Sequence, residues 1–129
     1  LVCGLLDLLV DVLDPGGVMR EYYKRLADGS YVALTNFWDP EGENPELSVL
    51  ARNLQRAFVE MGLGSGWYRP RDRLLEYLDG LDLIPPGLVE LEDWFPSGPP
   101  ARSRLPEERV LLGGVGHKRM PAPVQLRQV

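Results

Sequence analysis

The feature that most constrains the fold is an alternation of strand and helix patterns at the start of the chain. Residues 1–10 form a short, nearly continuous apolar run, which is typical of a strand covered on both faces. Asp14-Pro15 then supplies an N-cap and a proline at the first helical position, and apolar residues recur at helical spacing until Gly29. Residues 30–37 are rich in aromatic and β-branched side chains and predict the next strand. Because two strands joined by a crossover helix are usually parallel, this pattern predicts an α/β fold.

The same capping signal begins a second helix. Asn44-Pro45 supplies the cap and the first helical position, and Gly62 marks the end of the helix. Between them, apolar residues at spacings of three and four predict one stripe that we expect to lie in the core, made of Leu47, Leu50, Leu54, Phe58 and Met61.

The second half of the chain predicts a third helix and a pair of strands. The helix is expected over residues 70–79, a half-exposed strand over residues 88–94, and the last strand over residues 109–118. The proline-rich loop of residues 96–106 separates these two strands, which favours an antiparallel hairpin. The last strand contains three glycines, which weaken it unless another segment approaches closely: Gly113, Gly114 and Gly116.

Length and composition exclude several classes of protein. A chain of 129 residues can bury one core but is too short for two ordinary domains. Asp7 and Asp11 interrupt the first apolar run, and the sequence shows neither a membrane-span nor a signal-peptide pattern, so we expect a cytoplasmic protein. Cys3 is the only cysteine and His117 the only histidine, which excludes an internal disulfide and a Cys/His zinc cluster. The net charge of −5 argues against nucleic-acid binding.

Three local features suggest chemistry but have simpler structural explanations. The glycine-rich stretch of residues 62–70 lacks the preceding strand and the lysine that a phosphate-binding loop needs. His117 has no serine, cysteine or acid beside it, and we expect a strand-end residue without a catalytic role. Residues 100–129 are net basic, and we interpret their basic side chains as a solvated edge rather than an anion site: Arg102, Arg104, Arg109, Lys118 and Arg119.

Several strings resemble one known family. The most specific are DGLDLIPPGLVELEDWFP at residues 79–96 and GGVGHKR at residues 113–119, and LLDLLVDVLDP and RLADGSYVALTN nearer the start support them. These strings are similar to the C-terminal half of an S-adenosylmethionine-dependent methyltransferase family of GC-rich bacteria, formerly a domain of unknown function. The resemblance covers residues 1–119 and leaves residues 120–129 as a C-terminal tail.

The resemblance implies the C-terminal half of a class I, Rossmann-like methyltransferase fold, whose sheet is mostly parallel with one antiparallel strand near the edge. Residues 1–10 would be the fourth strand and residues 31–37 the fifth, parallel to each other and joined by a crossover helix, followed by two further helices and the terminal antiparallel hairpin. The acidic, glycine-rich cofactor loop of the family, DxGxG, does not occur in this sequence. Because Leu1 already lies inside an apolar run, we expect a fragment that lacks the cofactor-loop half and is inactive alone.

The resemblance also implies two sets of site residues, since ligands of open α/β sheets lie outside the carboxyl ends of the strands. One set would lie nearest the cofactor, S-adenosyl-L-methionine, at the end of the fourth strand: Gly4, Leu6 and Asp7. The other would face the methyl acceptor at the end of the fifth strand: Thr35, Asn36, Phe37 and Trp38. A capping role for Asp7 and ordinary packing for the second set are the alternatives. No metal is implied, and the sequence does not decide whether Asp7 or Asp39 serves as a general base.

Two functional hypotheses follow. The first is methyl transfer from S-adenosyl-L-methionine to a small-molecule acceptor. The second is a non-catalytic remnant that acts as an interaction or dimerisation module, through the exposed apolar edge of the first strand. Neither hypothesis involves a nucleic acid or a membrane as a partner.

Overall fold

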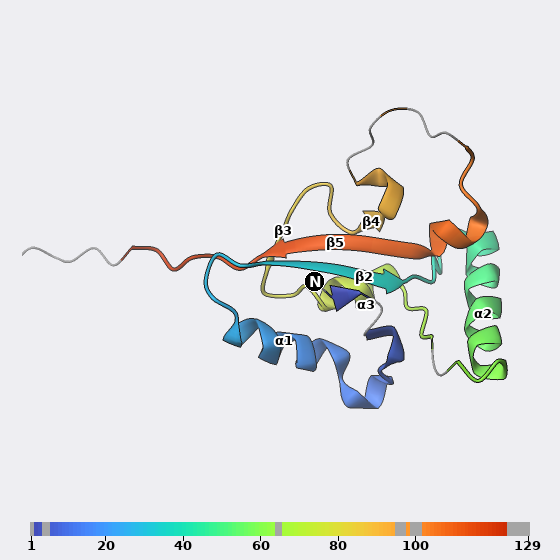
Figure 1. The fold of residues 1–129 in the computed structure, drawn as a ribbon, viewed down its shortest axis with the longest axis horizontal. Coiled ribbons are helices and arrows are strands. Elements are labelled where there is room, and N and C mark those ends of the chain that lie inside the picture. The colour runs from blue at the N-terminus through green and yellow to red at the C-terminus, as the bar shows by residue number, and fades with distance from the viewer. Residues whose placement is uncertain (1, 4–5, 64–65, 95–97, 99–101, 124–129) are drawn as a thin grey trace, which may run out of the picture.

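The computed structural model describes residues 2–3, 6–63, 66–94, 98 and 102–123, with the backbone alone for residues 2–3. Its centre is a five-stranded sheet with the order β1-β2-β5-β3, in which β4 also pairs with β5. The two long strands lie side by side and run in opposite directions (Figure 1). The strands are β1 (Val2–Cys3), β2 (Tyr31–Phe37), β3 (Asp82–Leu83), β4 (Val89–Glu90) and β5 (Leu111–His117).

The strand directions differ from a simple parallel sheet. β1 pairs with β2 in parallel, with Val2 opposite Leu34 and Cys3 opposite Thr35. β5 is antiparallel to β2, β3 and β4, so within the described part of the chain it is the strand that runs against the others. The expected parallel pair is therefore present only as a two-residue contact. Most of the pairing is antiparallel because the last strand lies between β2 and β3.

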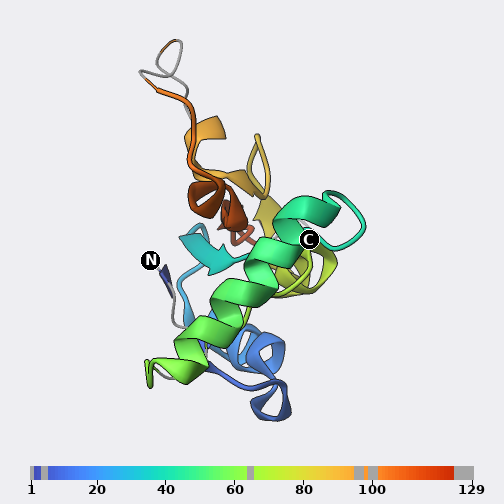
Figure 2. The same ribbon diagram turned by 90° about the vertical axis from the view of Figure 1, so that its right-hand side faces the viewer.

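Three α-helices accompany the sheet: α1 (Pro15–Arg25), α2 (Pro45–Glu60) and α3 (Arg71–Glu76). Both predicted caps are confirmed, since Gly17 N donates to Asp14 Oδ1 at 3.1 Å and Leu47 N donates to Asn44 Oδ1 at 3.2 Å. α1 connects β1 to β2 along one face of the sheet, whereas α2 lies across the end at which β2 finishes (Figures 1 and 2). No helix in the described residues is long and apolar enough to cross a membrane.

The core divides into two clusters. The main cluster packs α1, α3 and the segment after α3 against the sheet, and includes Met19, Tyr23, Leu34, Tyr77 and Leu112. A smaller cluster fixes α2 to the short 3-10 helix Pro106–Val110, with Leu47, Ala51 and Val110 at its centre. The expectation of a fully buried stripe on α2 is wrong at its end, because Met61 is 70% exposed. There the helix extends beyond the segment on which it packs.

The first predicted strand is much shorter than expected. Among the described residues, strand pairing at this end of the chain covers Val2–Cys3, and 3-10 turns occupy Leu6–Leu8 and Asp11–Leu13. The expected strand over residues 1–10 is wrong because Asp7 turns inward to bond the end of β2, which an extended chain would prevent. An apolar run of this length does not reveal such a turn.

The terminal hairpin is confirmed, but its first strand is shorter than predicted. β4 covers two residues of the expected range 88–94, and Leu91–Asp93 forms a 3-10 helix. The sequence analysis did not assign β3, which pairs with the far end of β5. Both strands are short because they share one edge of β5 and the chain must bend between them.

The glycines of β5 lie where other segments approach closely, which is the condition under which three glycines suit a strand. A Cβ at Gly116 would lie 2.8 Å from Leu81 Cβ, and a Cβ at Gly114 would lie 3.1 Å from the buried side chains of Leu78 and Leu88. At Gly113 the nearest atom is Leu91 Cδ2, at the far end of a side chain that is 39% exposed. The connections after α3 thus pack directly on the backbone of β5.

These contacts generate a first prediction. Gly116→Ala should lower the free energy of unfolding by about 1–3 kcal/mol, because Leu81 Cβ cannot move without moving the backbone. Gly113→Ala is the matched control and should cost clearly less, since the end of Leu91 can swing away. Urea denaturation of the three proteins measures the difference, and equal costs would contradict the close approach at Gly116.

Candidate functional site

The candidate site lies where β1 and β2 end. Asp7 follows β1 and turns inward, while Asn36 and Phe37 are the last two residues of β2. Asp7 Oδ1 accepts a hydrogen bond from Phe37 N at 3.1 Å and another from the side-chain amide of Asn36. The backbone oxygen of Asp7 accepts from Trp67 N at 2.9 Å. Three separate chain segments therefore meet at Asp7: its own turn, the end of β2, which bonds the carboxylate, and the segment of Trp67, which bonds the backbone.

Two oxygens at this site are buried without a hydrogen-bond partner. Asp7 is 1% exposed and Asn36 is 0% exposed. Asp7 Oδ2 and Asn36 Oδ1 have no partner in the structure. Buried acceptors without a donor cost free energy, so they mark a site at which a ligand or another segment can donate.

The environment of Asp7 changes its protonation. Burial raises the pKa of its carboxyl from 3.8 to about 6, against the opposing effects of the Phe37 N–H, the Arg69 charge and the Asn36 amide. A carboxyl group with a pKa close to neutrality can exchange a proton with a bound molecule. Asp7 is therefore the described group best suited to acid–base chemistry at this edge.

Asp39, the other acid considered as a base, is engaged elsewhere. Its Oδ1 accepts from Ser48 Oγ at 2.5 Å and its Oδ2 lies 3.4 Å from Arg52 Nε. Both partners belong to α2, so Asp39 fastens that helix to the end of β2. The geometry favours Asp7 over Asp39 as the group that handles a proton.

An aromatic cluster lies around the side chain of Phe37, on the face of β2 opposite Asn36. The ring of Phe37 stacks on that of Tyr68 with centroids 4.6 Å apart, and it contacts Phe58 of α2 at 5.5 Å. Gln55 Oε1 accepts from Tyr68 N at 2.9 Å, which ties the 62–70 connection to α2. All three rings are partly exposed. Phe58 and Tyr68 were not predicted as site residues, because they are remote from β2 in sequence.

Arg69 is the most important residue that sequence reasoning missed. It is 5% exposed, and its guanidinium donates to the carbonyl oxygens of Leu6, at 2.8 Å, and Leu9. Its Nε lies 3.2 Å from Asp11 Oδ1. The 62–70 stretch was interpreted as a plain loop, and no local pattern signals that its arginine enters the interior.

The predicted site residues have different environments. Asp7, Asn36 and Phe37 come together as described above. Leu6 belongs to the main core, and Trp38 is also in that core, with the Arg71 guanidinium 4.8 Å from its ring centroid. Thr35 is partly buried on the opposite face of β2 from Asn36, and Gly4 lies outside the described residues. The assignments of these residues to cofactor or acceptor stay predictions.

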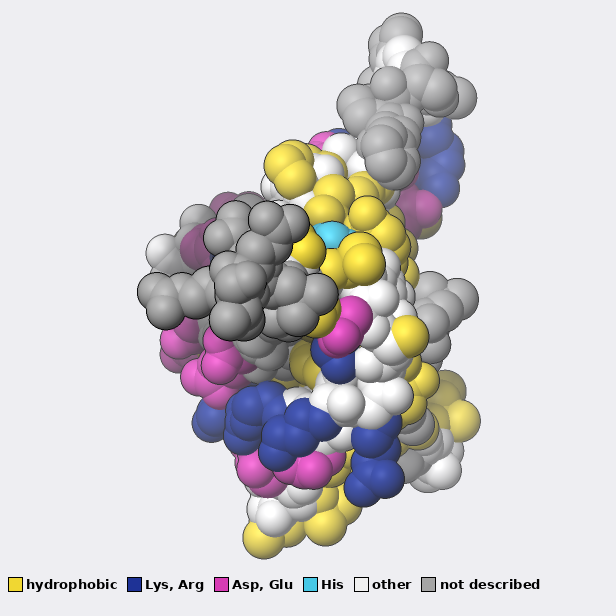
Figure 3. All heavy atoms as spheres, turned by 90° about the vertical axis from the view of Figure 1, so that its left-hand side faces the viewer, with side chains coloured by type: hydrophobic (Ala, Val, Ile, Leu, Met, Phe, Trp, Pro, Cys, Tyr) yellow, Lys and Arg dark blue, Asp and Glu magenta, His cyan; other side chains and the backbone are white. Residues whose placement is uncertain are grey.

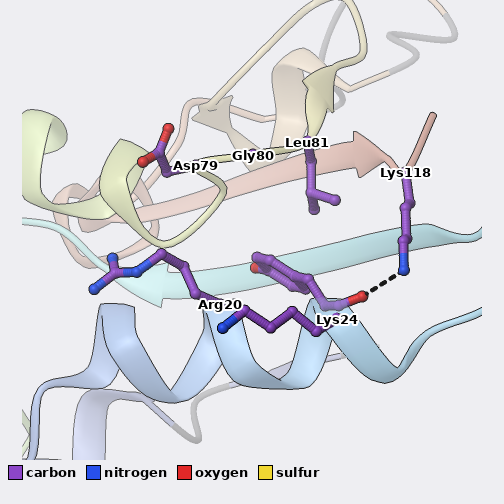
Figure 4. A pocket seen from close by; sticks show the side chains of 7 residues that line it. Arg20, Lys24, Asp79, Gly80, Leu81 and Lys118 are labelled. Carbon is purple, nitrogen blue, oxygen red and sulfur yellow. Dashed lines mark hydrogen bonds between the residues drawn. The ribbon is translucent and has the colours of Figure 1, made fainter.

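A pocket of about 540 Å³ lies elsewhere, between α1 and the connection that follows α3 (Figure 4). Lys118 reaches into this pocket and donates to the carbonyl oxygens of Tyr23, at 2.8 Å, and Leu26, at 2.6 Å. Its ammonium group therefore satisfies carbonyl oxygens at the C-terminal end of α1. The described members of the predicted site do not line this pocket: its residues are Arg20, Tyr23, Lys24, Asp79, Gly80, Leu81 and Lys118.

His117 lies at the end of β5, opposite Asp82 of β3, whose carboxylate pairs with Arg119. His117 stacks on Tyr31 with centroids 4.5 Å apart and is surrounded by hydrophobic side chains (Figure 3). The five basic residues considered above all contact carboxylates, which agrees with their interpretation as an edge. The pairs are Arg102–Glu108, Arg104 with Glu90, Glu92 and Asp93, Arg109–Glu90, Lys118–Asp28 and Arg119–Asp82.

The pKa of Asp7 generates a second prediction. Because the folded state raises this pKa from 3.8 to about 6, it binds the proton more tightly than the unfolded state does. The free energy of unfolding should therefore fall by about 3 kcal/mol from this group as the pH rises from about 4 to about 6. Asp7→Asn should remove that fall, whereas Asp79→Asn on the surface should leave it in place. Urea denaturation across this pH range tests both, and an unchanged profile in Asp7→Asn would contradict the buried carboxylate.

Comparison with known proteins identifies the family of this chain. A family model described as S-adenosyl methyltransferase matches residues 1–119. A crystal structure of a candidate methyltransferase from Thermobifida fusca YX is 28% identical, with a TM-score of 0.74, and covers 91% of this chain and 41% of its own. A DUF574-family protein from Streptomyces avermitilis MA-4680 shares the fold, at 23% identity and a TM-score of 0.75, over 91% of this chain and 42% of its own.

Two facts qualify the comparison. This chain spans about two fifths of the length of these solved proteins. No curated protein matches the chain. The family model nevertheless covers nearly all of the sequence and confirms the resemblance found in residues 79–96 and 113–119. The chain belongs to the S-adenosyl methyltransferase family.

Proposed function

We propose that this chain supplies the acceptor side of a class I, Rossmann-like domain that transfers a methyl group from S-adenosyl-L-methionine to a small molecule. The observation that carries the proposal is the meeting of Asp7 with Asn36 and Phe37 where β1 and β2 end. Ligands of open α/β sheets bind outside the carboxyl ends of the strands, which is where this meeting occurs. The strand directions support the proposal, since β5 is reversed relative to the other described strands.

The residues present fit the cationic part of the cofactor. Asp7 Oδ2 and Asn36 Oδ1 are buried acceptors that need a donor. The Asp7 carboxylate would hold a positively charged group, because opposite charges attract strongly where water is excluded. When bound, S-adenosyl-L-methionine supplies a methyl carbon activated by its positively charged sulfur.

The chain's own residues would position the acceptor and exclude water. In-line methyl transfer depends mainly on alignment of the two reactants, and less on covalent help from the protein. The partly exposed rings of Phe37, Phe58 and Tyr68 offer an apolar wall for the acceptor. Asp7 can accept the proton that an amine or hydroxyl nucleophile loses as its new bond to carbon forms.

The main cofactor contacts belong, in this proposal, to a segment outside this chain. The DxGxG pattern is absent from the sequence, and similar solved proteins are more than twice as long. The described residues at the site supply hydrogen-bond acceptors and an aromatic wall, which together make up only part of a binding site. We therefore expect weak cofactor binding and no methyl transfer by this chain alone.

Titration with S-adenosyl-L-methionine, followed through backbone amide NMR signals, tests the proposal. The signals of Asn36 and Phe37 should shift, with an affinity weaker than micromolar. Asp7→Asn should weaken binding by about tenfold, because it removes the charge that faces the ligand. Asp79→Asn, in the pocket of Figure 4, should leave binding unchanged. Shifts confined to that pocket, or sub-micromolar binding, would contradict the proposal.

Self-association is a second candidate function, favoured by the position of β1. Within the described residues, β1 is at the end of the sheet order and pairs only with β2. An unpaired strand edge is a template for pairing with another chain. This function predicts a concentration-dependent dimer in sedimentation experiments, and a monomer at all concentrations would exclude it.

A further inference from the structure

A buried arginine holds the segment that presents Asp7. The Arg69 guanidinium donates to the carbonyl oxygens of Leu6 and Leu9, which lie on either side of Asp7 in sequence. The cost of burying this side chain is offset only if its hydrogen bonds are satisfied, and these carbonyls satisfy it. The turn around Asp7 is thus fixed by a side chain from another part of the chain.

The backbone of Arg69 is tied to the same strand that holds Asp7. Arg69 N donates to Phe37 O at 3.4 Å, and Asp39 N donates to Arg69 O at 2.9 Å. Asp7 is therefore held from two sides: its carboxylate bonds the end of β2, and its flanking carbonyls bond an arginine that extends from that same end.

The Arg69 guanidinium interacts with two acidic residues, one exposed to solvent and one buried. Asp11, whose side chain is 68% exposed, lies 3.2 Å from Arg69 Nε. Asp7 is buried, and the positive charge of Arg69 acts on it. Among the described residues, the phenols of Tyr68 and Tyr77 also interact with Asp7; burial raises their pKa values to about 12, so they are neutral at physiological pH.

We propose that Arg69 is a positioning residue of the candidate site and couples the charge of the exposed Asp11 to that of the buried Asp7. An ionised Asp11 balances the guanidinium and weakens its effect on Asp7. When Asp11 is neutral, the whole positive charge acts on Asp7 and favours its carboxylate form. The role in methyl transfer rests on the proposed function, whereas the coupling of charges does not.

The coupling gives the protein a route by which its surface affects a buried carboxyl group. Removing the charge of Asp11 would make Asp7 more acidic and therefore more fully ionised at pH values close to its own pKa of about 6. That state holds a cation more strongly but takes up a proton less readily. The balance between cofactor binding and proton acceptance at the site would then follow the state of Asp11.

The test follows the Asp7 carboxyl carbon by NMR as the pH is changed. Asp11→Asn should lower the pKa of Asp7 by about half a pH unit or more, because it removes a negative charge from the guanidinium. Asp79→Asn removes a surface carboxylate away from Arg69 and should leave that pKa unchanged. An unaltered Asp7 in Asp11→Asn, or an equal change in both variants, would overturn the proposal.

A second variant separates this role from simple structural support. Arg69→Lys keeps the positive charge but cannot bond both carbonyls and Asp11 together. It should loosen the turn, seen as faster hydrogen exchange at Trp67 N and Phe37 N, both of which donate to Asp7. Unchanged exchange at both amides would overturn the positioning role. Asp11→Asn leaves the arginine in place and tests the charge coupling in a folded protein.

Cofactor titration of the same proteins distinguishes the two proposals. At pH 5.5, Asp11→Asn should bind S-adenosyl-L-methionine about twofold more tightly than the native chain, because lowering the Asp7 pKa from about 6 by half a pH unit doubles the ionised fraction of Asp7 at that pH. A changed Asp7 pKa without any cofactor-induced shift would contradict the proposed function while supporting the coupling. Cofactor-induced shifts with an unchanged Asp7 pKa would support the proposed function and overturn the coupling.

Discussion

The pairing of β2 with β5 is the interaction on which the rest of the structure depends. Seven residue pairs join Tyr31–Phe37 to Leu111–His117, two segments that are far apart in the sequence. This pairing leaves one edge of β2 for β1 and gives the other edge of β5 to β3 and β4. Every other strand of the described sheet thus depends on these two. Because β2 ends beside α2, the pairing also sets the position of the candidate site.

At the candidate site, the unfavourable burial of the Asp7 carboxyl group is partly offset by the contacts that it makes. Asp7 is removed from water, which raises its pKa, yet Phe37 N, Asn36 and Arg69 each favour its ionised form. Such opposing effects leave the carboxyl group close to neutrality, as suits a group that exchanges protons. The same burial weakens the fold at neutral pH, so stability is lost at the place where chemistry is expected. Sites of this kind are commonly less stable than an apolar core would be.

Charge pairing organises the surface in a different way. The basic residues of the last third of the chain contact nearby carboxylates, and most of these pairs have at least one exposed side chain. Exposed pairs contribute little to stability, but they leave no concentrated positive field for an anionic partner. The interior pair differs, since Arg69 is buried and its partner Asp11 is not. That asymmetry is what allows a surface acid to influence a buried one.

The sequence by itself determined the helices, the long strands and the family. Caps such as Asp14 and Asn44 are local signals that can be read from the sequence. The three glycines of β5 suit a strand only if another segment packs closely on it, and the structure contains such contacts. Through the resemblance to a known family the sequence assigned Asp7 to the end of one strand and Asn36 and Phe37 to the end of the next, and the structure shows the hydrogen bonds that join them. Only the tertiary structure decided that the chain turns at Leu6–Leu8, that β5 lies between β2 and β3, and that Arg69 enters the interior. These features depend on contacts between residues distant in sequence, and the pattern of apolar residues along the chain carries no record of such contacts.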